Sequence, residues 1–483
     1  MPLEQLLAVS LTAYILIMFA ISIYAQSRVK TVEDFVVAGR SLPVWMASAT
    51  LLATWFGAGP VLTASTEVAK HGIHKAALDP IGAGICLLLA GMFFATRLWE
   101  MGILTLSDFF RVKYGERAEI FSACIMVPSY FGWIAAQFVA LAHVLNYFFH
   151  MPVPYAIALV AITGTLYTCL GGMWSVTLTD ALQMILVITG LVLLTTQAFL
   201  TIGGGNIATG FDTVIGGIAD KSPDKLSLFH STEDGGIFMW ISIVLAGSLG
   251  NIPGQDLMQR IFAAKDAKTA KRSCFIAGVS YLILGCVTVS LGLVASYLYS
   301  DSTKLMDSIL PPLSSHFLSP ALTTVFMLAV VSAVLSTIDS AILAPATVLA
   351  QNLLGKIPQS RLDSITLNRI SIIAIGVMTY LLAISGKGAY ALLEGAYSLT
   401  MVGLFIPLAL GLTSKRRDEI AALSAMAGGI VILLLHEIFG WQFFLEPLDP
   451  IKALKLSPAL SATASALLLY LICGKRAEEK NPA

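Results

Sequence analysis

Oxygen-bearing side chains lie inside segments of this chain that are otherwise almost wholly apolar. Ser336 and Thr337 are adjacent on one such segment, Asp339 follows them, and Asp180 lies within another. Oxygen atoms are the ligands that hard cations prefer. An ionisable side chain at membrane depth costs about 2.5 kcal/mol or more and is by default a functional hypothesis. These residue types predict that a small cation binds inside an apolar bundle.

Two breaks rich in glycine and proline interrupt apolar segments at matching places. The first runs from Ala53 to Pro60 and the second from Gly247 to Gly254. Such breaks leave backbone carbonyl and amide groups free, which membrane depth tolerates only where they line a cavity. Paired broken helices are typical of secondary transporters built from inverted repeats. An ion or a solute is the natural occupant of such a cavity.

The hydroxyls and the first break together predict a Na⁺ site. Ser336 and Thr337 offer hydroxyl oxygens, and Ala333 offers a carbonyl one turn earlier on the same segment. Ala53 and Phe56 offer two more carbonyls where the first helix unwinds. Five oxygens from two helices make a suitable cage for a hard cation. The alternative is that the hydroxyls only bond back to their own helix.

Asp180 and Asp339 predict a second cation site, or a relay on the inward path of Na⁺. Either aspartate could instead make a hydrogen bond between packed helices or an ion pair with a loop arginine.

Aromatic and acidic residues supply candidates for a solute pocket. A tryptophan in a membrane protein more often faces lipid or lies at the membrane interface. Trp55 lies in the first break, which disfavours that role. Asp79 opens the third apolar segment and Asp256 follows the second break. The candidate solute-site residues are Trp55, Gly57, Asp79, Trp133, Gly254 and Asp256.

Composition restricts the class of protein. Of 483 residues, 57% are hydrophobic and 12% charged, and the mean hydropathy is +0.82. Soluble domains carry about 25% charged residues, so the chain is an integral membrane protein. The net charge of zero argues against a nucleic-acid partner. The six cysteines show neither metal-ligand nor disulfide spacing.

Thirteen segments are long and apolar enough to span a membrane. They are 5–25, 44–69, 78–97, 118–149, 154–173, 177–203, 236–260, 272–299, 318–352, 366–386, 389–413, 419–438 and 456–473. We expect an all-α membrane protein in which residues 1–483 form one transmembrane transporter domain.

The thirteen spans divide into two blocks of five with three flanking helices. An extra N-terminal helix (5–25) precedes repeat one (43–203) and repeat two (236–413), and two C-terminal helices (419–473) follow. Each block opens with a broken helix, so helices two and seven are the broken ones. An odd number of spans per block makes the repeats inverted.

Loop charges predict the orientation. Most of the 29 Lys and Arg residues, Arg260 among them, fall in cytoplasmic loops when the N-terminus is outside and the C-terminus cytoplasmic, as the positive-inside rule requires. The largest outside loop, 204–235, is expected to be a solvated connector. Short outside loops without evident glycosylation sites favour a bacterial inner (plasma) membrane.

Four motifs resemble those of the sodium:solute symporter family. They are Gly39–Leu42, Gly171–Gln183, Gln259–Lys265 and Ser336–Ser340. The resemblance covers nearly the whole chain and implies a LeuT-type fold with solute entry coupled to the Na⁺ gradient. It places the family's conserved Na⁺ site on Ala53, Phe56, Ala333, Ser336 and Thr337, and the second Na⁺ site of some members on Asp180, Asp339 and Ser340.

Within the family the chain looks most like the high-affinity choline transporter branch. The segments that carry this likeness are 53–55, 80–82, 91–95 and 252–253. It implies that Trp55 and Trp133 belong to an aromatic cage that holds a quaternary ammonium by cation–π contact. The branch has aromatic residues where this chain has Ala83 and Gly254. Asp79 and Asp256 could compensate with negative charge or serve a different polar solute.

These features predict Na⁺-coupled symport of a small organic solute by alternating access. Choline or another quaternary ammonium is the leading solute, and an amino acid such as proline, pantothenate or a monocarboxylate is the alternative. The absence of an arginine in mid-helix disfavours simple carboxylates. A non-transporting solute sensor is disfavoured because no sizeable soluble domain is appended. No catalytic metal set or nucleophile motif indicates an enzyme. The expected partners are the solute, Na⁺ as coupling ion, and the lipid bilayer.

Overall fold

The computed structural model describes residues 3–229, 236–299, 308–356, 363–386, 388–414, 418–441, 443, 446 and 457–480. All regular elements in these ranges are helices. In the first half they are α1 (Leu3–Gln26), α2 (Val32–Val37), α3 (Val44–Trp55), α4 (Ala64–His71), α5 (Ala83–Leu89), α6 (Ala95–Glu100), α7 (Leu106–Tyr114), α8 (Glu116–Phe149), α9 (Val153–Ile202) and α10 (Ile207–Lys221). In the second half they are α11 (Gly236–Leu249), α12 (Gln255–Ala263), α13 (Ala267–Leu298), α14 (Leu310–Phe317), α15 (Pro320–Val348), α16 (Ser364–Ala383), α17 (Ala389–Thr400), α18 (Ile406–Thr413), α19 (Glu419–Phe439) and α20 (Pro458–Lys480).

The apolar helices confirm the predicted helical membrane fold. Nine of the described helices are long and apolar enough to cross a membrane, and four shorter apolar helices accompany them. Together they correspond to the thirteen predicted spans. Residue 456, the predicted start of the last span, and residues 230–235 of the predicted connector lie outside the described residues.

Both predicted helix breaks are present. Helix α3 ends at Trp55, and Phe56 leaves the helical conformation with φ −85° and ψ 57°. The chain turns helical again at the π-helical turn Gly59–Thr63 and continues as α4. Pro60 has no amide hydrogen, so it cannot bond the Phe56 carbonyl as the next helical turn would. In the second block α11 ends at Leu249 and α12 begins at Gln255.

A glycine bends α9 where two separate spans were expected. Gly172 has φ 54° and ψ −146°, a conformation that L side chains rarely adopt. A Cβ at this position would also lie 2.5 Å from the Phe35 carbonyl oxygen. The predicted spans 154–173 and 177–203 therefore follow one another directly through this bend, without an intervening loop.

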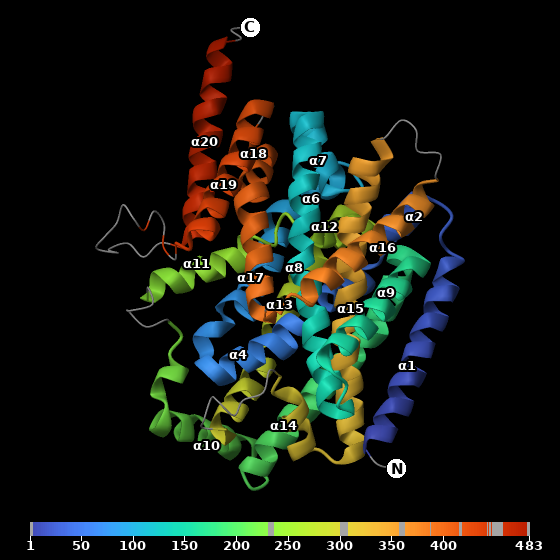
Figure 1. The fold of residues 1–483 in the computed structure, drawn as a ribbon, viewed down its shortest axis with the longest axis vertical. Coiled ribbons are helices and arrows are strands. Elements are labelled where there is room, and N and C mark those ends of the chain that lie inside the picture. The colour runs from blue at the N-terminus through green and yellow to red at the C-terminus, as the bar shows by residue number, and fades with distance from the viewer. Residues whose placement is uncertain are drawn as a thin grey trace.

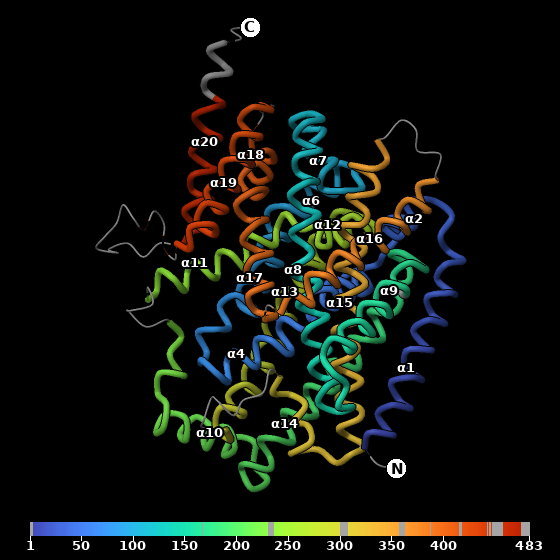
Figure 2. Tube along the Cα trace, viewed as in Figure 1, coloured from blue at the N-terminus to red at the C-terminus, as the bar shows by residue number. Residues whose placement is uncertain are grey.

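Helix α15 lies in the middle of the bundle and is buried along most of its length. It packs against α9 and α8, and α1 lies on the outside of α9 (Figure 1). Helices α19 and α20 pack together at the opposite edge of the molecule, and α1 begins at one end of the bundle while α20 extends to the other (Figure 2).

The segment expected to be a solvated connector contains a helix. Asn206 caps α10 by accepting the amides of Ala208 and Thr209, and α10 packs on α9 and α13. After α10, the Lys225 ammonium donates to the Ala69 carbonyl at 2.8 Å. The sequence reasoning missed this helix because its apolar residues are few and interspersed with glycine.

Candidate sodium and solute sites

The first break and the middle of α15 meet at Thr337. The Thr337 hydroxyl donates to the Ala333 carbonyl at 3.1 Å and lies 3.4 Å from the Ala53 carbonyl. All three residues are at most 2% exposed. Phe56 lies in the same break, also fully buried, with its carbonyl freed by Pro60. Three of the five predicted Na⁺ ligands, Ala53, Ala333 and Thr337, therefore lie together beside the first break.

Gly57, which we predicted to bind the solute, has its nearest neighbours beside the predicted Na⁺ ligands. A Cβ at Gly57 would lie 2.1 Å from the Thr337 hydroxyl oxygen and 2.8 Å from Gln137 Oε1. The Gln137 side-chain oxygen accepts a hydrogen bond from the Ala58 amide at 2.8 Å and so fixes the unwound segment in place. Only glycine allows the break to approach α15 this closely. Its role in solute binding stays a prediction, and the side chains nearest to it are those of Thr337 and Gln137.

Ser336, the fifth predicted ligand, is held by a carboxylate. Its hydroxyl donates to Asp180 Oδ1 at 2.6 Å, and the Thr50 hydroxyl donates to Asp180 Oδ2 at 2.5 Å. Asp180 is completely buried on α9. It thus links α3, α9 and α15, and places a negative charge one hydrogen bond away from the predicted Na⁺ cage.

Asp339 and Ser340 lie one turn further along α15 and meet an arginine. The Ser340 hydroxyl donates to Asp339 Oδ1 at 3.2 Å and accepts Arg260 Nη2 at 2.5 Å. Arg260 is only 1% exposed, although we expected it in a cytoplasmic loop. The expectation that no arginine lies deep in the bundle is therefore wrong. We call Asp180, Asp256, Arg260, Asp339 and Ser340 the Arg260 cluster.

Asp256, at the start of α12, is bound by two aromatic side chains. The Trp55 indole Nε1 donates to Asp256 Oδ2 at 2.5 Å, and the Tyr130 hydroxyl donates to Asp256 Oδ1. The ring of Tyr130 lies 5.8 Å from that of Trp133, with a tilt of 54°. A carboxylate between three aromatic rings offers a cation both negative charge and π-faces.

A small pocket lies beside this group. Its lining includes Trp133, Tyr130, Gly254, Asp256 and Tyr397. A Cβ at Gly254 would lie 3.4 Å from the Tyr130 hydroxyl oxygen, so tyrosine occupies space next to the position where the branch has an aromatic residue. The free volume is about 20 Å³, enough for one water but not for an organic solute. The pocket is closed in this conformation.

Asp79 is separated from the pocket. The Tyr281 hydroxyl donates to Asp79 Oδ1 at 2.7 Å and lies 3.2 Å from the Trp55 carbonyl. The other carboxylate oxygen approaches Gly59, where a Cβ would lie 2.5 Å from it. Asp79 therefore supports the second half of the broken helix, and it reaches the solute residues only through Tyr281.

The sequence reasoning missed several residues of these sites, among them Tyr130, Arg260 and Gln137. Tyr130 precedes Trp133 by three positions, which places both on one helix face, and that spacing could have identified it. Arg260 follows Asp256 by four positions on α12 in the same way. Gln137 carries no such signal, because its partner Ala58 is far away in sequence.

A much larger cavity opens at one end of the bundle. Its volume is about 530 Å³, and its lining includes Glu67 on α4, His143 on α8 and Tyr390 on α17. The predicted orientation assigns this end to the outside. It lies beyond Trp133 along α8, on the side of Val139, Ala140 and His143.

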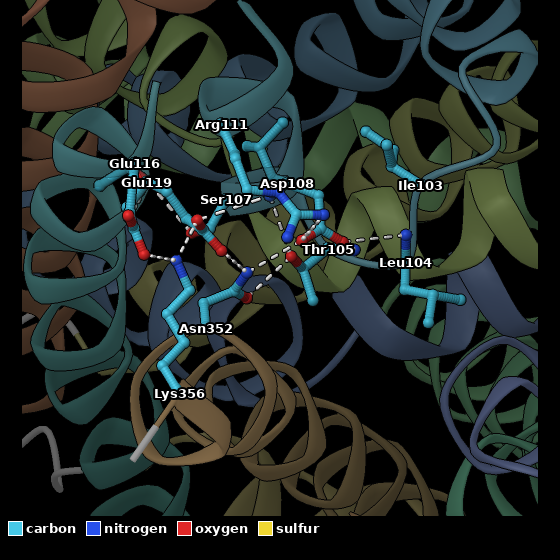
Figure 3. Close-up of polar contacts among 12 residues, drawn as sticks. Ile103, Leu104, Thr105, Ser107, Asp108, Arg111, Glu116, Glu119, Asn352 and Lys356 are labelled. Carbon is cyan, nitrogen blue, oxygen red and sulfur yellow. Dashed lines mark hydrogen bonds and ion pairs between the residues drawn. The ribbon is translucent and has the colours of Figure 1, made fainter. Parts of the chain in front are cut away.

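The opposite end is tied together by a polar network that we call the Glu119 cluster, namely Thr105, Asp108, Arg111, Glu119, Asn352 and Lys356 (Figure 3). Glu119 is 1% exposed; it accepts Asn352 Nδ2 at 2.8 Å and the Lys356 ammonium. Asn352 also donates to Asp108 at 3.0 Å and accepts from Thr105 at 2.8 Å. The network joins α7 and α8 to the two helical turns, Leu349–Leu353 and Leu354–Lys356, that follow α15.

Comparison with known proteins gives consistent matches. The sequence model of the sodium:solute symporter family matches residues 35–429. High-affinity choline transporter 1 of Caenorhabditis elegans is 28% identical over 426 residues, which cover 83% of this chain and 71% of the relative. The Homo sapiens high affinity choline transporter 1 is 26% identical over 88% of this chain and 75% of the relative. The sodium/pantothenate symporter of Haemophilus influenzae is 22% identical over 90% and 91%.

Solved structures match over almost the whole chain. A Na⁺-coupled sialic acid symporter in a substrate-bound outward-open state has a TM-score of 0.75 at 17% identity, covering 97% of each chain. A nucleobase-cation-symport-1 family transporter in a closed conformation has a TM-score of 0.59 at 12% identity, covering 93% and 95%. These likenesses confirm the predicted LeuT-type fold. The exact boundaries of the two repeats stay a prediction.

Proposed function

Because the chain belongs to the sodium:solute symporter family, and is therefore a membrane transporter and not an enzyme, we propose that it carries a small quaternary ammonium, choline or a close relative, by Na⁺-coupled symport. Na⁺ binds Ala53, Phe56, Ala333, Ser336 and Thr337. The ammonium binds beside Asp256 among Trp55, Tyr130 and Trp133.

One observation carries this proposal: the two sites share the last turn of α3, next to the first break. The Ala53 carbonyl faces the Thr337 hydroxyl at 3.4 Å, and two residues later the Trp55 indole donates to Asp256. An ion that fixes the backbone at Ala53 also fixes the position of Trp55. Na⁺ binding and solute binding are therefore coupled through neighbouring residues of α3.

The chemistry of the pocket favours a cation over an anion. Asp256 is negatively charged when ionised, and aromatic faces attract quaternary ammonium groups. A carboxylate solute such as an amino acid, pantothenate or a monocarboxylate needs a positive partner. Arg260, the one buried arginine of the described residues, donates to Ser340 and does not line the pocket. This arrangement supports choline over the alternatives.

Alternating access follows from the distribution of open space. The 530 Å³ cavity opens at the end predicted to be outside, while the Glu119 cluster ties the opposite end. Solute entry requires the pocket beside Trp133 to expand from its present 20 Å³. Na⁺ can promote that change only by binding one conformation more tightly than the other. A membrane potential adds about 2.3 kcal/mol per charge per 100 mV to inward Na⁺ movement.

The experiment that tests the proposal is uptake of labelled choline into proteoliposomes with an inward Na⁺ gradient, and with K⁺ in its place. We expect Na⁺-driven accumulation that tetramethylammonium, a quaternary ammonium without a carboxylate, but not pantothenate or acetate, reduces. Uptake of proline or pantothenate in place of choline would refute the solute assignment and leave the Na⁺ cage intact. Choline uptake that proceeds equally in K⁺ would refute the coupling.

A further inference from the structure

Buried charges in this molecule are strongly unequal in sign. Among the described residues the buried carboxylates are Asp79, Glu119, Asp180, Asp256 and Asp339, whereas Arg260 is the only buried lysine or arginine. A buried ion needs a partner of opposite charge, because desolvation costs several kcal/mol per ion. Buried fixed cations are therefore fewer than buried carboxylates, which makes the position of Arg260 informative.

Arg260 lies among three of these carboxylates. Its guanidinium is within electrostatic range of Asp180, Asp256 and Asp339. Within the described residues none of the three forms an ion pair with it at 4.0 Å or less. Instead Nη2 donates to Ser340 at 2.5 Å, and Nη1 approaches the Asp256 carbonyl at 3.4 Å. The side chain thus extends from α12 into the position predicted for a second Na⁺.

The oxygen that Arg260 occupies is the one a second Na⁺ would use. A hydroxyl donates one hydrogen bond and accepts two. The Ser340 hydroxyl donates to Asp339, accepts from Arg260 and has the Thr54 hydroxyl at 3.1 Å. A Na⁺ on this oxygen would face both a full set of neighbours and the positive guanidinium at close range. Like charges at that separation in a buried site repel strongly.

The two predicted cation positions on α15 therefore differ in what already occupies them. At the first, the Thr337 hydroxyl lies 3.4 Å from the Ala53 carbonyl, and among the described residues no lysine or arginine bonds to either residue. At the second, the Arg260 guanidinium bonds to Ser340 at 2.5 Å. One of the two positions is left for Na⁺.

We propose that Arg260 is the fixed cation of the second site and that the protein therefore couples one Na⁺ to each cationic solute. The inference rests on the proposed function, whose number of ions it specifies. Arg260 acts as a positioning residue, since it does not line the solute pocket and approaches Asp256 only at its backbone carbonyl.

The decisive measurement is equilibrium binding of ²²Na⁺ to the purified full-length protein without choline. We expect one ion per protein in the wild type. Arg260→Lys keeps the charge and should keep one ion, whereas Arg260→Gln opens the position and should bind a second. Arg369→Gln is the matched control, because Arg369 donates to the backbone of α9 at Cys169, away from both sites. Two ions in the wild type, or one in a folded Arg260→Gln protein, would overturn the proposal.

A second variant decides the matter if Arg260→Gln does not fold. Asp339→Asn removes the carboxylate of the second site while Arg260 stays. If Na⁺ does not use that site, the ²²Na⁺ concentration at half-saturation should change less than about twofold in this variant. A loss of 1.4 kcal/mol of binding free energy would change it about tenfold. A tenfold rise or a lost ion would refute the proposal. These assays need no organic solute, so failed choline transport would count against the proposed function alone.

Discussion

The Arg260 cluster in the middle of the bundle and the Glu119 cluster at its end both bury carboxylates, but they neutralise them differently. Glu119 receives the Lys356 ammonium and the Asn352 amide, and the Arg111 guanidinium lies 3.9 Å away. Among the residues that the structure describes, Asp180 accepts hydrogen bonds only from the hydroxyls of Thr50 and Ser336. Fixed cations balance the first carboxylate, whereas neutral donors merely hold the second in place.

This difference separates a structural tie from an ion site. The charge of a carboxylate paired with lysine is already neutralised, so it does not need a mobile cation. Breaking the pair separates the helices that it joins. A carboxylate held by hydroxyls keeps its charge available, and the same hydroxyl oxygens can turn toward an incoming Na⁺. The following predictions, from the largest expected effect to the smallest, test whether the two clusters do these different jobs.

Asp180→Asn should cause the largest loss. It removes the charge next to the Na⁺ cage and weakens the hold on Ser336, and a hydrogen bond to a charged group contributes about 1.5–3 kcal/mol. We expect half-saturation by Na⁺ to rise at least about tenfold, measured as Na⁺-dependent choline uptake in proteoliposomes. Asp108→Asn is the control from the Glu119 cluster. Equal effects of the two variants would contradict the distinction.

Trp55→Ala should weaken solute binding next. It removes a ring face and the 2.5 Å bond to Asp256, and a desolvated cation–π contact is worth about 2 kcal/mol. The Kd of labelled choline at saturating Na⁺ should rise about 30-fold. Trp55→Phe keeps a ring and should lose less. If Trp55→Ala leaves choline affinity unchanged, Trp55 does not belong to the pocket.

Thr337→Ala should raise half-saturation by Na⁺ by about fivefold, since a neutral hydroxyl contributes about 1 kcal/mol. Thr337→Ser retains the oxygen and should behave like the wild type. Na⁺-dependent thermal stabilisation of the purified protein measures this without any solute. Unchanged Na⁺ affinity in Thr337→Ala would remove Thr337 from the cage.

In Glu119→Gln, Na⁺ affinity should stay within about twofold of the wild-type value. A loss of 1.4 kcal/mol of binding free energy would lower it about tenfold. The effect of this substitution should appear in conformation, because Lys356 loses its buried partner and α8 loses its tie to the end of α15. A cysteine placed at Ser107, which is fully buried, should become more reactive toward a water-soluble thiol reagent in this variant. Loss of Na⁺ affinity without increased labelling would mean that Glu119 serves the ion site.

The amino-acid sequence by itself determined the spans, the two breaks and the hydroxyl pair on α15. These features are local. Apolar length sets where a helix can cross a membrane, and glycine and proline unwind the backbone where they stand, as at Gly57 and Pro60. For the same reason the sequence could indicate that Ser336 and Thr337 share a helix with Ala333, which is one turn earlier.

Only the tertiary structure decided which of these residues meet. Gly57 packs against Thr337, Asp79 bonds to Tyr281, and Arg260 reaches Ser340, although each pair is separated by 80 residues or more along the chain. Such contacts depend on the rotation and axial position of each helix in the bundle. Those are set by side-chain packing over the whole interface and leave no trace in hydropathy. The buried arginine was therefore assigned to a loop until the packing of α12 against α15 was known.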